Sequence, residues 1–181
     1  MCPATQNPAS PVSLLVSISS RCSPVSESNG ERFASFGYEL KPWRLIDEGH
    51  IVVCPQSDTF ITKTMPRQWK MWLPEAVAAA QRKWPGRKIV TREWSSNKPV
   101  QMRTLHDDLK GAGLVITHSS AAAVEAVIEG IPVHVSEVSA LQGMSCSSDN
   151  EQRLQYLGAL ADNQWTLDEI KNGSAWRWLN R

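Results

Sequence analysis

The stretch from Val115 to Val135, VITHSSAAAVEAVIEGIPVHV, decides the fold class of this chain. It begins with an apolar run typical of a buried strand and continues through a polar turn into an alanine-rich helical segment, which Gly130 ends. A second apolar run follows directly. A strand, a helix and a second strand in this order form a β-α-β unit, in which the two strands lie parallel. The sequence therefore predicts an α/β fold with a parallel sheet.

The polar turn between the first strand and the helix is the predicted ligand site. Ser119 and Ser120 are residue types that cap helices, and the first helical amides, including that of Ala121, have no partner within the helix. Such amides attract phosphate or carboxylate groups. Glu125 follows Ser120 by about one and a half helical turns, where its carboxylate could accept ribose hydroxyls. In the structural alternative, the serines only cap the helix and Glu125 is a solvated residue.

The segment His118–Ala126, followed by Gly130-Ile131-Pro132-Val133, resembles the donor-binding segment in the C-terminal domain of GT-B glycosyltransferases. It is most similar to the capsular-polysaccharide type, and glycosyltransferase-like proteins encoded by bacteriophages carry similar segments. The resemblance implies a Rossmann-like three-layer sandwich with a parallel sheet, equivalent to one half of a GT-B fold. It also implies that Ser119 and Ser120 contact the nucleotide phosphates and that Glu125 contacts the ribose.

The similarity extends in order from about Trp43 to Val135. Residues 49–57 resemble the first strand of the donor-binding domain and the loop that follows it. The resemblance therefore places Gln56 and Ser57 beside the nucleotide-sugar donor, as further binding residues.

Arg92 is another candidate, at the end of the next predicted strand, residues 87–92. A guanidinium at the carboxyl end of a strand in an open α/β sheet can bind phosphate through two parallel hydrogen bonds. Proteins of the resembled type often have an Arg followed by Pro or His-Pro there, whereas this chain has Glu93 and Trp94 after Arg92. The alternative is a surface arginine that pairs with Glu93 or Asp107.

His118 lies in the predicted ligand turn and is the candidate catalytic residue. An imidazole at this position could donate a hydrogen bond to a phosphate or carry a proton. A structural histidine is the alternative, because residue spacing identifies no second catalytic partner.

Composition limits the other function classes. The four cysteines are widely separated and form no Cys-x-x-Cys or Cys/His metal pattern, so we expect free thiols, a reducing compartment and a cytoplasmic location. The net charge of +1 favours neither nucleic acid nor an anionic membrane as a partner. We expect no metal site and no cofactor, since the nucleotide-sugar donor would be a substrate.

The first 31 residues differ in character from the rest. They are rich in Ser and Pro, and their apolar island from Val12 to Ile18 is too short to span a bilayer. We expect this segment to be disordered, or to form a strand that needs a partner. Residues 32–181 are expected to form the Rossmann-like domain, which ends in helices, one of them opened by a capping box at Thr166 and Glu169.

These predictions lead to two main functions. In the first, the chain is a glycosyltransferase that stabilises the departing nucleoside phosphate with Ser119, Ser120, the helix amides and Arg92. In the second, it is a non-catalytic protein that binds or sequesters a nucleotide at the same turn. A third option is a subunit that retains only the fold.

Sugar transfer makes a further demand on the chain. Fewer than 50 residues precede the first family-like strand, which is too few for a second Rossmann half. Transfer to the unidentified acceptor would therefore need a homodimer, a partner domain that completes the cleft, or an acceptor held by the C-terminal tail.

Overall fold

The computed structural model describes residues 28–56, 60, 71–92, 104–136, 139, 141–144 and 149–180. These residues belong to two compact units. The sheet unit comprises the described residues between Glu39 and Ser147, and the helical unit comprises those up to Tyr38 and from Ser148 onward. The predicted N-terminal segment lies outside the described residues up to position 27.

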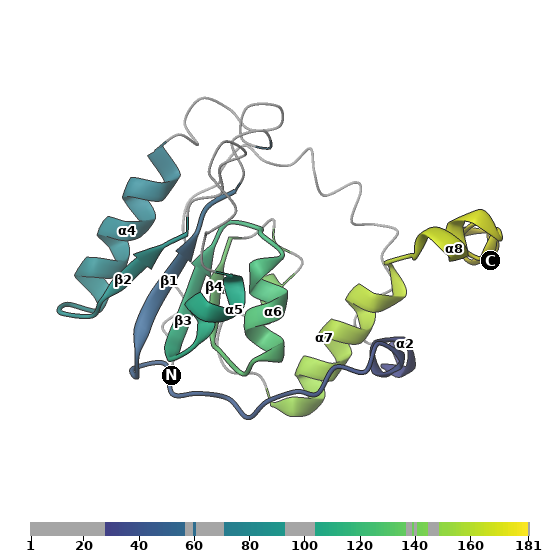
Figure 1. The fold of residues 1–181 in the computed structure, drawn as a ribbon, viewed down its shortest axis with the longest axis horizontal. Helices are drawn as coiled ribbons and strands as arrows, with labels where there is room; N and C mark the ends of the chain where they lie inside the picture. Colours follow the sequence, from purple (N-terminus) through teal and green to yellow (C-terminus); the bar gives the residue numbers. More distant parts are fainter. Residues whose placement is uncertain are drawn as a thin grey trace. The chain divides into compact units, whose positions relative to one another are not determined.

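The sheet unit contains four parallel strands in the order β2-β1-β3-β4 (Figure 1). The strands are β1 (His50–Cys54), β2 (Ile89–Thr91), β3 (Ala112–Thr117) and β4 (Val133–Val135). Its helices are α4 (Trp72–Lys83), α5 (Leu105–Leu109), α6 (Ala122–Ile128) and the short 3-10 helix η3 (Gln142–Met144). Helices α4 and α6 cover opposite faces of the sheet (Figure 1). The predicted α/β class, with a parallel sheet in a Rossmann-like three-layer arrangement, is confirmed.

The two central strands are buried almost throughout, because helices cover both faces of a parallel sheet. All six residues of β3 and the last four residues of β1 are buried. Ile51 and Val53 of β1 pack with Leu114 and Ile116 of β3 against Ala80 of α4, and these five form a hydrophobic cluster. This cluster fixes α4 over β1 and β3.

Gly130 ends α6 as the sequence predicts. Its φ angle is +73°, and the N–H of Ile131 donates to Ala126 O at 2.8 Å while the N–H of Gly130 donates to Val127 O at 3.1 Å. These two bonds form a Schellman motif. A Cβ atom at Gly130 would lie 2.0 Å from Pro42 O, so the position requires glycine for both its conformation and its close packing.

The helical unit is built from segments far apart in the sequence. It contains α2 (Glu31–Ser35), α7 (Asn150–Asp162), α8 (Leu167–Lys171) and α9 (Ser174–Leu179), and α2 packs against α7. The predicted capping box is confirmed, since Thr166 Oγ1 accepts from the N–H of Glu169 and the Glu169 carboxylate accepts from the N–H of Thr166. In the described part of the chain, no helix has the length and apolar character needed to cross a membrane.

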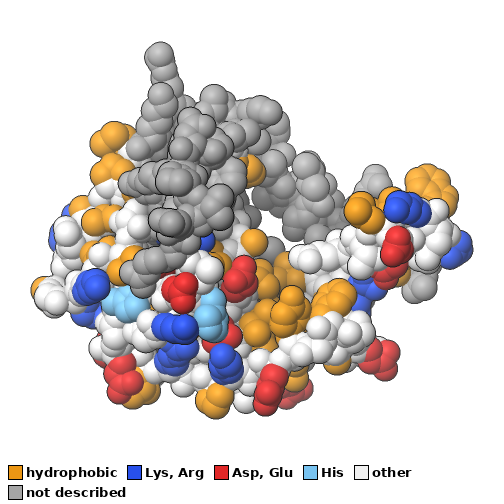
Figure 2. All heavy atoms as spheres, viewed as in Figure 1, with side chains coloured by type: hydrophobic (Ala, Val, Ile, Leu, Met, Phe, Trp, Pro, Cys, Tyr) orange, Lys and Arg blue, Asp and Glu red, His pale blue; other side chains and the backbone are white. Residues whose placement is uncertain are grey.

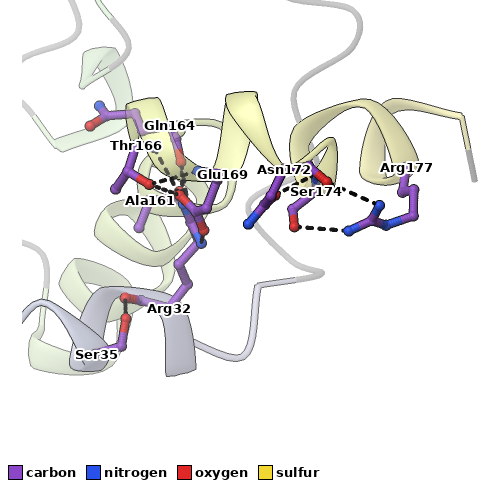
Figure 3. Close-up of polar contacts among 9 residues, drawn as sticks. All are labelled: Arg32, Ser35, Ala161, Gln164, Thr166, Glu169, Asn172, Ser174 and Arg177. Carbon is purple, nitrogen blue, oxygen red and sulfur yellow. Dashed lines mark hydrogen bonds and ion pairs between the residues drawn. The ribbon is translucent and has the colours of Figure 1, made fainter.

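Arg32 joins α2 to the C-terminal helices (Figure 3). Its guanidinium makes two hydrogen bonds to the Glu169 carboxylate, at 2.6 and 2.8 Å, and donates to the carbonyl oxygens of Ala161 and Gln164. It also lies 4.8 Å from the centre of the Trp165 ring, within the range of a cation–π interaction. Planar two-point contacts of this kind suit Arg better than Lys.

A substitution at Gly130 tests the close packing at the end of α6. We expect Gly130→Ala to lower the free energy of unfolding by about 2–5 kcal/mol, the sum of left-handed strain and overpacking. The matched control is Gly111→Ala. Gly111 has a φ of +72° but open space around its Cβ position, so only strain of about 1–2 kcal/mol is expected. Equal losses for the two variants in urea denaturation would contradict the packing argument.

The Arg32–Glu169 pair predicts a pH dependence of stability. The hydrogen bonds from Arg32, and then those from the N–H and hydroxyl of Thr166, lower the pKa of Glu169 from 4.5 to about 2. A carboxyl group whose pKa is lowered by folding stabilises the fold above its unfolded pKa, and this contribution is lost as the pH falls. We expect Glu169→Gln to unfold at lower temperature than the wild type at pH 7. The difference should shrink between pH 4.5 and 2.

The neighbouring carboxylate serves as the control for this measurement. Asp168 lies on the same helix, and its side chain is 93% exposed. Asp168→Asn should therefore change the unfolding midpoint little, as followed by circular dichroism at both pH values. A gap between Glu169→Gln and wild type that stays constant down to pH 2 would count against the role of this ion pair.

Candidate functional site

The predicted site residues lie at the carboxyl edge of the sheet, at the point where the strand order changes direction. From β1 the chain passes to β2 on one side, and it then returns to β3 on the other side of β1. The helices that follow β1 and β3 lie on opposite faces (Figure 1). Open α/β sheets bind ligands in the crevice beyond such a switch point. Gln56 follows β1 and the turn 118–120 follows β3, so both flank this position.

The side-chain carboxamide of Gln56 contacts the turn that follows β3. Gln56 Oε1 accepts from the N–H of Ser119 at 3.1 Å, from the N–H of Ser120 at 3.1 Å and from the Ser119 hydroxyl. This orientation of the carboxamide is assigned from the hydrogen-bond pattern, because the opposite one would set its NH2 group against two N–H donors. Three donors therefore converge on a single oxygen position. We call this arrangement the turn nest.

The hydroxyl of Thr117 connects the turn nest to the end of β1. This hydroxyl donates to Cys54 O at 2.6 Å, which joins the carboxyl ends of β1 and β3, and accepts from the N–H of Ser120 at 3.3 Å. Sequence reasoning did not select Thr117, although a hydroxyl residue at the end of an apolar strand was a signal for it. Cys54 is a free, buried thiol, as predicted, and burial raises its pKa to about 12.

Ala121 is the N-cap residue of α6, without a side-chain cap hydrogen bond, and the Ser120 hydroxyl contacts the helix one residue further on. Ser120 Oγ accepts from the N–H of Ala122, the first residue of α6, at 3.3 Å. Ala121 is exposed, and its carbonyl accepts from the N–H of Val124 at 2.9 Å. The Ser120 hydroxyl thus accepts from the first residue of α6, and the Ser120 N–H belongs to the turn nest.

His118 is buried beneath the turn, with only 3% of its surface exposed. Its ring meets the Trp72 ring edge-on, with 6.3 Å between the ring centres. Its carbonyl accepts from both the N–H and the hydroxyl of Ser136, which follows β4. Burial lowers the pKa of His118, so the imidazole is neutral at pH 7. This arrangement suits a residue that holds the turn in place.

Arg92 lies at the end of β2, on the other side of β1 from the turn nest. Its N–H donates to Val53 O at 2.9 Å, and its guanidinium forms a 2.7 Å ion pair with Asp108. The two side chains are 22% and 6% exposed, so the carboxylate is nearly buried. The sequence predicts Glu93 or Asp107 as the partner; Glu93 lies outside the described residues, and Asp108 is a partner that the sequence analysis does not name. Asp107 forms the capping box of α5 with Thr104.

The remaining candidates are less closely associated with the turn nest. Glu125 lies in the first turn of α6 and is exposed to solvent. Ser57 lies outside the described residues. The structure thus brings together Gln56, Ser119 and Ser120, with Glu125 on the solvent side of the following helix.

Charged side chains of both signs and potential metal ligands are dispersed among the described residues. Acidic and basic side chains are interspersed on the face seen in Figure 2, with no continuous area of one sign there. Among the residues that the structure describes, no group of three or more His, Cys, Asp or Glu side chains could hold a metal ion. The chemistry supported at the turn nest is hydrogen bonding to an oxygen-rich ligand.

The ion pair at the end of β2 predicts unequal effects of removing its two members. Arg92→Ala removes the guanidinium beside a carboxylate that is only 6% exposed, so we expect a loss of about 2–4 kcal/mol in unfolding free energy. Asp108→Ala leaves an arginine that solvent can reach, and should cost about 1–2 kcal/mol. Urea denaturation of both variants measures the difference. A larger loss for Asp108→Ala would contradict this account of the pair.

Comparison with known proteins adds no further constraint on this site. Searches of protein-family models, of curated proteins and of solved structures found no match to the chain.

Proposed function

We propose that the sheet unit binds the phosphate-bearing part of a nucleotide at the switch point between β1 and β3. The observation that carries this proposal is the turn nest, in which the amides of Ser119 and Ser120 and the Ser119 hydroxyl converge on one oxygen. A phosphate oxygen is an anionic acceptor, and charge-assisted hydrogen bonds are about twice as strong as neutral ones. A phosphate oxygen can therefore replace the neutral carboxamide oxygen of Gln56.

The displaced Gln56 side chain would gain a second role. A carboxamide group has an oxygen that accepts hydrogen bonds and an NH2 group that donates two. After rotation, its NH2 group would face the bound phosphate and donate to it. Gln56 would thus occupy the site in the free protein and contribute to it in the complex.

The proposed ligand is a nucleotide sugar, as the resemblance to glycosyltransferase donor-binding segments suggests. Glu125 is exposed on the helix that follows the turn nest, where a carboxylate can accept the ribose hydroxyls of a nucleotide. The nucleotide sugar would be a substrate or bound ligand, and no cofactor is part of the proposal.

For the chemistry that follows binding, the burial of His118 favours a non-catalytic binder over a transferase that uses this histidine as a proton carrier. A general acid or base must reach the proton that it transfers, and His118 is 3% exposed with a lowered pKa. A glycosyltransferase remains the second candidate, through electrostatic stabilisation of the departing phosphate. It would need a homodimer or a partner domain to supply the acceptor side of the cleft.

Isothermal titration with UDP, GDP, CMP and their sugar conjugates tests the binding proposal. We expect one nucleotide class to bind the wild type and Gln56→Glu to weaken that binding more than tenfold, because a carboxylate of the same shape fills the turn nest and repels phosphate. Gln81→Glu is the matched control, since it adds the same charge at an exposed position of α4, and should bind like the wild type.

Two further measurements complete the test. Glu125→Ala should weaken binding of the whole nucleotide but not of inorganic pyrophosphate, which has no ribose. Release of free nucleotide from the bound sugar conjugate would identify the transferase, and its absence would identify the binder. Failure of every nucleotide to bind, or equal affinities for Gln56→Glu and Gln81→Glu, would overturn the proposal.

A further inference from the structure

We propose that a second ligand site lies between α4 and the β3–β4 side of the sheet, and that it binds a small organic anion with a flat apolar body. The site is a groove with a cavity volume of about 320 Å³. This volume is at the lower end of the range for small-molecule pockets in proteins. We call it the α4 groove.

The walls of the α4 groove are largely apolar. Trp72 and Trp84 stand at the two ends of α4, and small side chains line the helix between them, including Ala76 and Ala79. Ile116 of β3 contributes to the opposite wall. Trp84, the C-cap residue of α4, follows Trp72 by twelve positions, which corresponds to about 18 Å at 1.5 Å per residue. Flat rings pack favourably against indoles, and alanines allow a ligand to approach the helix closely.

One end of the α4 groove carries positive charge. Lys83 lines the groove, and its Nζ lies 4.7 Å from the centre of the Trp84 ring. His134 lines the groove from β4, where it pairs in register with Ile116 and therefore lies on the same face of the sheet. An acidic group at this end could contact both Lys83 and His134.

The other charged group of the groove lies away from this end. Glu75 also lines the groove from α4, eight residues before Lys83, or about 12 Å along the helix axis. The groove is therefore polarised, with the positive charge of Lys83 beside the His134 ring at one end and the negative charge of Glu75 near Trp72. A ligand with one acidic group at the end of an apolar ring system complements this pattern.

The α4 groove borders the turn nest through Thr117, whose hydroxyl accepts from the N–H of Ser120, and through Ser136, which contacts His118 O. Desolvation of the ring, and then the charge of Lys83, lower the pKa of His134. An anion bound at this end would favour the imidazolium form, and so raise that pKa. His134 thus offers a direct readout of an anion in the groove.

Titrations with three probes, followed by NMR of the His134 ring, test this proposal. The probes are naphthalene-2-sulfonate, which has a ring and an anion, 2-naphthol, which has the ring without the charge below pH 8, and sulfate, which lacks the ring. We expect saturable binding of the sulfonate and at least fivefold weaker binding of the other two. The pKa of His134 should rise when the sulfonate is bound.

Variants of α4 locate the site. Lys83→Ala should weaken sulfonate binding about three- to fivefold, the range of an exposed ion pair, whereas Arg82→Ala removes an exposed charge that does not line the groove and should have no effect. Ala79→Trp should fill the groove and reduce binding more than tenfold, and Gln81→Trp is its control. If Ala79→Trp fails to fold, the Lys83 and Arg82 variants still decide the question.

Three results would overturn the proposal: no sulfonate binding, equal affinities for the sulfonate and 2-naphthol, or equal effects of Lys83→Ala and Arg82→Ala. The equal-affinity result would identify an apolar surface that does not select anions. Gln56, whose variant tests the nucleotide proposal, does not line the groove. Gln56→Glu should leave sulfonate binding unchanged, so failure of this proposal and failure of the nucleotide proposal are separable.

Discussion

The burial of β1 and β3 on both faces is the constraint on which the sheet unit depends. A parallel strand that is apolar on both sides must have a helix above and below it, and α4 and α6 meet this need from opposite faces. Because α4 and α6 lie on opposite faces, the switch point falls between β1 and β3. The hydroxyl of Thr117 then joins the strand ends through Cys54 O, so the residues after β1 and β3 emerge side by side. The position of the turn nest follows from core packing.

The turn nest also shows how a protein can keep a polar turn satisfied in the free state. Amides at the start of a helix need acceptors, and Gln56 supplies one for Ser119 and Ser120. A neutral side chain satisfies the amides without adding a charge, so under the proposed function it would not repel an incoming anion. The affinity of any ligand is then the difference between its own hydrogen bonds and those of Gln56.

Local features of the site could be predicted from the sequence, whereas contacts between distant segments could not. The β-α-β unit and its end at Gly130 follow from hydrophobic periodicity and from backbone conformations that favour glycine. Gln56 was selected as a binding residue by resemblance, but its closure over Ser119 depends on strands 63 residues apart. The pairing of Arg92 with Asp108 and the α4 groove likewise arise from the packing of α5 and α4 in three dimensions.

The contact between Arg32 and Glu169 has a consequence for how the chain is made. These residues are 137 positions apart, and the whole sheet unit is encoded between them. Because chains emerge from the ribosome with the N-terminus first, α2 has no partner until α7 and α8 have been synthesised. The sheet unit can fold in the meantime. Shortening the chain within α8 would leave α2 without Glu169, even though the deletion is remote from it in sequence.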